Sequence, residues 1–147
     1  MSATTEMTPD WWVTKDGDKA CLSLFKRHYT ARKARKIEQF VGPGESLVLR
    51  TWDELAMFVW RKFIDDAVPK QEGVNCAVFR NEGPYLSSEL IRQADAIADI
   101  GWPGERHYTY VDPERVRSKN PGYCFLMAGW KRCGFTKTGL LILERNP

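Results

Sequence analysis

One segment in the second half of the chain constrains the fold more than any other. From Ser87 onward, apolar residues recur at intervals of three and four positions. They are Leu90, Ile91, Ala94, Ile97 and Ala98. This spacing places them on one face of a helix. We expect Ser87 or Ser88 to cap its first turn, and Gly101 followed by Pro103 to end it.

Strand patterns lie on both sides of this helix. Residues 46–50 and 55–60 are apolar runs separated by a short polar stretch, which predicts an antiparallel hairpin. The other expected strands are residues 11–13, 20–25, 75–80, 107–111 and 140–143, and a short second helix is expected over residues 122–128. A hairpin followed by a crossover helix predicts an α/β fold in which helices pack on the faces of a mixed sheet.

The chain is expected to form one domain. Its 147 residues are in the usual size range, and no repeat or linker divides them. Residues 1–10 are expected to be a flexible tail, and residues 11–147 a single domain. No apolar run is long enough to span a bilayer, so we expect a cytoplasmic protein without a membrane partner. The four widely separated cysteines are expected to be reduced thiols.

Positive charge is concentrated in one segment, although the net charge is only +3. The basic residues of this segment are Lys26, Arg27, Arg32, Lys33, Arg35 and Lys36. No acidic residue interrupts them, and His28 and Tyr29 lie among them. Such cations can neutralise phosphates, and an aromatic ring can stack on a base extruded from DNA. A solvated charged face is the alternative interpretation.

Several short motifs resemble one enzyme superfamily. Residues 120–134, Asn-Pro-Gly-Tyr-Cys-Phe-Leu-Met-Ala-Gly-Trp-Lys-Arg-Cys-Gly, resemble the last helix and turn of a GNAT acyltransferase. The strand from Val74 and the helix at Ser88 fall where that family binds acyl-CoA. Residues 25–30 resemble the His-Tyr-Ser-type motif of the phage Mom-like branch, and residues 111–113 resemble its Asp-Pro step. The resemblance implies a central mixed, mainly antiparallel sheet flanked by helices.

The resemblance also implies a set of site residues. Acetyl-CoA or another acyl-CoA would be bound by Arg80, Asn81, Gly83, Ser87 and Ser88. The catalytic residues would be His28, Tyr29 and Asp112. Because the Mom-like branch is associated with an iron ion held by His, Tyr and Asp side chains, His28 and Asp112 are candidate Fe(II) ligands. The same pair could instead serve as a base and the group that orients it.

The sequence departs from the family pattern at two places. Pro84 removes an amide donor from the expected phosphate loop, and Tyr85 stands where a small residue is usual. The acyl donor would then be bound differently, or would not be coenzyme A. Phe125 aligns with a tyrosine that often protonates the departing thiolate, and a phenylalanine cannot do this.

Three functions follow from these observations. The first is a phage-type, Mom-like acyltransferase that modifies an exocyclic amine of double-stranded DNA in the host cytoplasm and so protects the DNA from restriction. The second is an acyl-CoA-dependent N-acetyltransferase that acts on a protein lysine or a small amine, for example to disarm a host defence factor. The third is a non-catalytic binding protein on a GNAT scaffold. The sequence leaves open whether the chain is a monomer or a homodimer.

Overall fold

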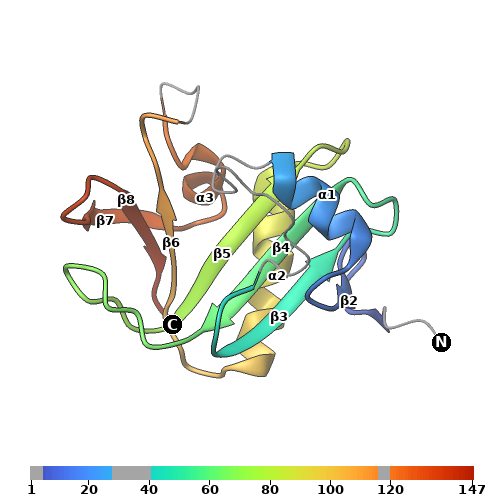
Figure 1. Ribbon diagram of the computed structural model, residues 1–147, viewed down its shortest axis with the longest axis horizontal. Helices are drawn as coiled ribbons and strands as arrows, with labels where there is room; N and C mark the ends of the chain where they lie inside the picture. Colours follow the sequence, from blue (N-terminus) through green and yellow to red (C-terminus); the bar gives the residue numbers. More distant parts are fainter. Residues whose placement is uncertain (1–4, 28–40, 116–119) are drawn as a thin grey trace.

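The computed structural model describes residues 5–27, 41–115 and 120–147, which form an eight-stranded, mostly antiparallel sheet and three helices (Figure 1). The strands are β1 (Thr5–Glu6), β2 (Trp12–Thr14), β3 (Glu45–Arg50), β4 (Ala56–Lys62), β5 (Val74–Asn81), β6 (His107–Val111), β7 (Lys131–Phe135) and β8 (Leu141–Arg145). The helices are α1 (Lys19–Arg27), α2 (Ser87–Gly101) and α3 (Tyr123–Met127). No helix among these residues has the length and apolar character needed to cross a membrane.

The sheet is mixed, as the order of the sequence elements predicts. Its strands lie in the order β1-β2-β3-β4-β5-β6-β8-β7. Neighbouring strands are antiparallel except β5 and β6, which are parallel. Helix α2 makes the crossover connection that a parallel pair requires.

The parallel pair is short, and its two strands separate toward their carboxyl ends. Pairing joins only residues 74–76 to residues 107–109, after which β5 continues to Asn81 and β6 to Val111. Helix α3 lies near these diverging ends (Figure 1). Its buried Phe125 packs edge-on against Phe79 of β5, with ring centroids 6.1 Å apart. The carboxyl end of β5 therefore packs against α3 and does not pair with β6.

Helices cover both faces of the sheet because successive side chains of a strand point to opposite faces. In β4, Phe58 and Trp60 belong to the core that the sheet shares with α2 and α3. The alternate residues Met57 and Val59 belong to a second core with α1. In Figure 1, α1 lies in front of the sheet and α2 behind it.

Buried tryptophans fix α2 against the sheet. The indole N–H of Trp11 donates to the carbonyl oxygen of Leu90 (2.7 Å), and that of Trp60 donates to the carbonyl oxygen of Ala94 (3.0 Å). A buried indole usually finds such a partner, because an unpaired N–H is costly away from water. These bonds set the position of the helix along the sheet as well as its distance from it.

A buried carboxylate completes this attachment. Asp95 of α2 accepts a hydrogen bond from the indole N–H of Trp130 (2.8 Å), and its other oxygen lies 2.7 Å from Nδ1 of His107 in β6. Arg145 of β8 binds both oxygens of Asp99, at 3.1 and 2.9 Å, and its Nε lies 3.9 Å from Asp95. One turn of α2 is thus connected to β6, to β8 and to the residue that precedes β7.

The prediction of a strand over residues 20–25 is wrong, because these residues lie in α1. Asp18 begins the helix: its side chain accepts the amide of Cys21 (3.0 Å), and its carbonyl accepts the amide of Leu22 (2.8 Å). Cys21 and Leu24, three positions apart, are the buried residues of this helix. This spacing belongs to a helix, although an apolar run this short also fits a strand.

Other expectations also need correction. The sequence did not predict β1 or β7, and Thr5–Glu6 pairs with β2 although residues 1–10 were expected to form a loose tail. Trp11 is completely buried, whereas Trp52 is 67% exposed. The residues around a tryptophan in the sequence do not show whether its ring is buried in the fold.

We expect Asp95→Ala to lower the free energy of unfolding by about 3 kcal/mol, because it leaves the buried groups of Trp130 and His107 without their acceptor. Urea unfolding followed by tryptophan fluorescence measures this loss. Asp66→Ala, at an exposed carboxylate, is the control and should change stability by less than about 0.5 kcal/mol. Equal effects of the two substitutions would show that the Asp95 network contributes little.

Candidate functional site

An ion-pair cluster joins the end of α1 to the end of β5. Arg27, the last residue of α1, binds both carboxylate oxygens of Glu82, at 2.9 Å each. Arg80 of β5 donates to the same carboxylate from its Nε (2.9 Å). The hydrogen bond with Arg27 holds the pKa of Glu82 below its usual value. The amide of Glu82 donates to the carbonyl oxygen of Leu55 (2.8 Å), which fixes the cluster to the turn before β4.

This cluster brings together two groups of residues that the sequence predicted separately. Arg27 belongs to the predicted nucleic-acid segment, and Arg80 to the predicted cofactor residues. Lys26 is exposed at the same end of α1. The remaining residues of the basic segment, together with the predicted catalytic residues of that region, lie outside the described residues. They are His28, Tyr29, Arg32, Lys33, Arg35 and Lys36.

The connection from β5 to α2 is organised by the side chain of Asn81. Its amide nitrogen donates to the carbonyl oxygen of Tyr85 (2.8 Å) and to the hydroxyl of Ser87 (2.9 Å), and its oxygen accepts the amide of Gly83 (3.0 Å). A Cβ on Gly83 would lie 2.8 Å from the Tyr85 ring and 3.0 Å from Cβ of Leu55. Glycine is therefore required here by close packing.

The expectation that Ser87 or Ser88 caps α2 is wrong. The N-cap residue is Leu86, and no side chain caps the helix. Ser87 is engaged by Asn81 instead, and Ser88 is buried. The amides of Glu89 and Leu90 both donate to the carbonyl oxygen of Leu86, at 3.0 and 3.1 Å. The amides of Ser87 and Ser88 precede the first intrahelical bonds and are the ones available to a bound acceptor.

Asp112 directly follows the carboxyl end of β6. Its side chain accepts the amide of Glu114 (3.0 Å), and its carbonyl accepts the amide of Arg115 (3.1 Å), so it forms a turn. Because β5 and β6 are parallel, Asp112 and Asn81 follow corresponding ends of neighbouring strands. We call the region formed by Arg27, residues 80–88 and Asp112 the carboxyl-end site.

Two titratable groups near this site are held in their neutral forms. Tyr85 donates its hydroxyl to Asp53 (2.7 Å), and burial together with this bond raises the pKa of Tyr85. Burial also raises the pKa of the Cys124 thiol in α3. Phe125, beside it, is 5% exposed and is a core residue. At neutral pH Tyr85 and Cys124 can donate protons but do not act as bases.

No group of three or more His, Cys, Asp or Glu side chains within residues 5–27, 41–115 and 120–147 is arranged to hold a metal ion. Asp112 is described but its predicted partner His28 is not, so the expected Fe(II) site is not described as a whole. The predicted pair stays a prediction.

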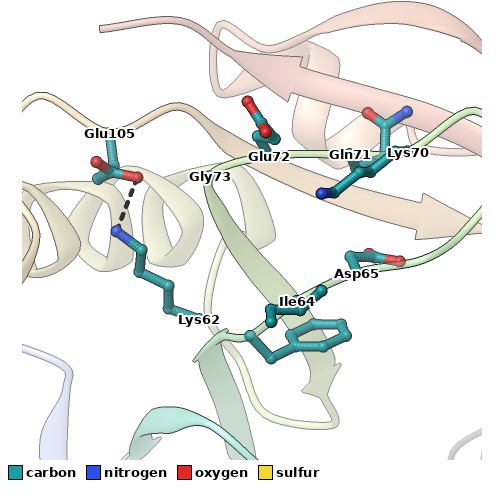
Figure 2. Close-up of a pocket in the computed structure, with 9 residues that line it drawn as sticks. Lys62, Ile64, Asp65, Lys70, Gln71, Glu72, Gly73 and Glu105 are labelled. Carbon is teal, nitrogen blue, oxygen red and sulfur yellow. Dashed lines mark ion pairs between the residues drawn. The ribbon is translucent and has the colours of Figure 1, made fainter.

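A pocket of about 290 Å³ lies at the opposite end of the sheet, before β5 and β6 (Figure 2). Lys62 and Glu105 point toward one another across it and form an ion pair of 3.1 Å. Asp65 on its wall is buried and accepts the hydroxyls of Tyr108 (2.8 Å) and Tyr110 (2.7 Å). Burial raises the pKa of both tyrosines, which therefore remain protonated. These polar groups of the pocket satisfy one another, which favours a structural role.

A second hollow, of about 480 Å³, is not anticipated by the sequence. It lies beside β7, and Pro113, the neighbour of Asp112, forms part of its wall. The sequence does not reveal β7, because its residues are mostly exposed and do not alternate. The available signal is Gly134, since an isolated glycine in a strand often marks a bulge.

Comparisons of the sequence with protein-family models and with curated proteins find no match.

We expect the Arg27–Glu82 contact to make stability depend on pH. A carboxylate with a lowered pKa contributes stability above its ordinary value of about 4.3, and this contribution is lost as the pH falls toward 3. Glu82→Gln should therefore lower stability at pH 7 by less than about 1 kcal/mol and flatten the pH dependence. Thermal unfolding at about five pH values between pH 3 and pH 7 measures both the loss of stability and the change in its pH dependence.

Glu89→Gln is the matched control, because Glu89 forms a single, half-exposed contact with Arg92 (3.4 Å). An unchanged pH profile in the Glu82 variant, or an identical change in the Glu89 variant, would contradict the assignment.

Proposed function

We propose that this chain is a GNAT-like acyltransferase of the Mom-like kind, which modifies an exocyclic amine of a DNA base and so protects the DNA from restriction. The observation that carries the proposal is the carboxyl-end site. There, the crossover helix α2 begins beside two diverging parallel strands, and Arg27 ties the start of the basic segment to the same place. In open α/β sheets, ligands bind outside the carboxyl ends of such strands.

The arrangement of elements also supports the resemblance. The sheet is mixed and mainly antiparallel with helices on both faces, which is the architecture that the resemblance implies. Residues 74–101 contain a strand followed by a helix, and α3 ends at Met127, two residues before Gly129, whose φ of 99° gives the left-handed turn that favours glycine. These features support the proposal of a GNAT-like fold.

Coenzyme A fits this site in part. When bound, its thioester would supply an activated acyl group. The first turn of α2 offers the amides of Ser87 and Ser88 and the positive end of the helix dipole, which suit a pyrophosphate. The amide of Gly83 is already bonded to Asn81, and Pro84 has none. The residues that would hold the donor are therefore Ser87 and Ser88 of the helix, and not Gly83 and Pro84 of the loop.

The chain's own residues divide the remaining tasks. Arg27 and Arg80 place positive charge at the end of β5, where both bind Glu82. His28 follows Arg27 directly in the sequence and is the proposed base that accepts a proton from the attacking amine, with Asp112 as the group that orients it. Phe125 cannot protonate the leaving group, so this proton would come from another side chain or from water.

Mass spectrometry of nucleosides digested from cells that express the chain tests the proposal directly. We expect a new nucleoside with the wild-type chain and a loss of at least about a hundredfold with His28→Ala, since general base catalysis contributes that much. The mass of the new nucleoside identifies the transferred group. An unchanged profile with folded, well-expressed protein would exclude base modification in those cells.

DNA binding gives a second measurement for the same proposal. Neutralising Arg32, Lys33, Arg35 and Lys36 to glutamine should weaken duplex binding and reduce its salt dependence. The control neutralises four exposed cations elsewhere, Lys15, Lys19, Lys70 and Arg92, and so has the same net charge. Equal losses would mean that total charge alone governs binding. Stabilisation by acetyl-CoA without DNA binding would favour a protein lysine or a small amine as the acceptor.

A further inference from the structure

The hollow beside β7 combines an apolar wall with one cation. Pro113, Pro121, Leu141 and Phe135 supply apolar surface, and Arg132 and Asn120 supply polar groups. Its volume of about 480 Å³ is within the usual range for sites that bind small ligands. It adjoins the turn at Asp112 through Pro113, and thus lies next to the carboxyl-end site.

A β-bulge brings the two key side chains of this hollow to the same face. Arg132 pairs with Leu143, and Gly134 pairs with Ile142, so Cys133 is the extra residue on β7. Residues three apart on a regular strand point to opposite faces. The extra residue cancels this alternation, and Phe135, opposite Leu141, therefore shares a face with Arg132. Gly134 has a φ of 145°, and a Cβ added there would meet no atom within 4 Å.

Phe135 is exposed although its neighbours on β8 are buried. Leu141 and Leu143 on that face belong to the core under α3, whereas Phe135 is 60% exposed. An exposed aromatic ring on the wall of a hollow offers a flat apolar surface to a ligand. This surface suits a planar ring, which can stack on it.

Arg132 provides the complementary charge. One terminal nitrogen, Nη2, donates to the side-chain oxygen of Asn120 (3.4 Å) and to the carbonyl oxygen of Pro121 (3.3 Å). Within the described part of the chain, both of these bonds use Nη2, so Nε and Nη1 face no competing acceptor there. The stretch from Lys131 to Gly139 contains no acidic residue, and Lys137 adds a further positive charge. The hollow therefore favours an anion that carries a flat ring.

We propose that this hollow binds one nucleotide of a nucleic acid, with the base stacked on Phe135 and the phosphate at Arg132. The inference rests on the proposed function, because it assigns a binding subsite to the DNA substrate of that enzyme. A base extruded from a duplex needs a stacking partner and a cation for its phosphate. Both groups lie here, beside Asp112.

Fluorescence anisotropy with a labelled single-stranded DNA of about ten nucleotides tests the subsite in the full chain, without any acyl donor. Phe135→Ala should weaken binding about tenfold, and Phe135→Tyr should keep near wild-type affinity because it retains the ring. Arg132→Gln should weaken binding and lower the salt slope by about one. Trp52→Ala, at another exposed aromatic residue, should leave binding unchanged.

Thermal unfolding of each variant establishes that it is folded, which is expected because both side chains are exposed. Wild-type affinity in a folded Phe135→Ala variant would overturn the subsite, as would a loss confined to Arg132→Gln, which would indicate a general anion surface. No binding by the wild-type chain would overturn it as well.

If Phe135→Ala weakens binding while cells contain no modified nucleoside, the subsite holds and the transferase proposal fails. If modified nucleosides form while Phe135→Ala binds normally, the transferase proposal holds and the subsite fails.

Discussion

The buried carboxylate of Asp95 is the interaction on which the arrangement of this protein depends. It accepts hydrogen bonds from the side chains of Trp130 and His107, which come from different parts of the sheet. A buried charge is tolerated only when it is paired and hydrogen-bonded, so these partners must be in place together. The position of α2, and with it the crossover between β5 and β6, follows from that requirement.

The carboxyl-end site lies beyond this rigid part of the molecule. Its contacts with α1 are exposed ion pairs, which contribute little to stability and weaken in salt. The core contacts of α2, in contrast, are buried. The protein thus attaches α2 by buried contacts and ties the end of α1 to the end of β5 by exposed ion pairs. Such a difference lets one part bind and adapt while the other keeps its geometry.

The sequence predicted the elements whose patterns are local. In residues 87–101 the apolar residues recur with a helical period, and the central strands are long apolar runs. Both kinds of element are therefore predictable from the sequence. Helix α1 does not follow from the sequence pattern, because its apolar run also fits a strand and Asp18, which caps it, is equally typical of a turn. The short edge strands carry too few buried residues to show a pattern.

The candidate site was predictable only in part. Arg80, Asn81 and Gly83 could be selected because they lie between a strand and a helix, but the bonds of Asn81 that order this turn depend on three-dimensional packing. The link from Arg27 to Glu82 spans 55 positions and leaves no trace in any local pattern. The hollow beside β7 depends on a bulge at Cys133, and a sequence does not reveal which residue of a strand is unpaired.

The bulge in β7 also bears on how this sheet ends. Among the strands that the structure describes, β7 pairs only with β8, so its outer backbone groups could pair with a strand of another molecule. Bulges and charged side chains on an edge disfavour such contacts, and β7 has both: the bulge at Cys133 and the cations of Lys131 and Arg132. The feature that shapes the hollow therefore also protects this side of the sheet from aggregation.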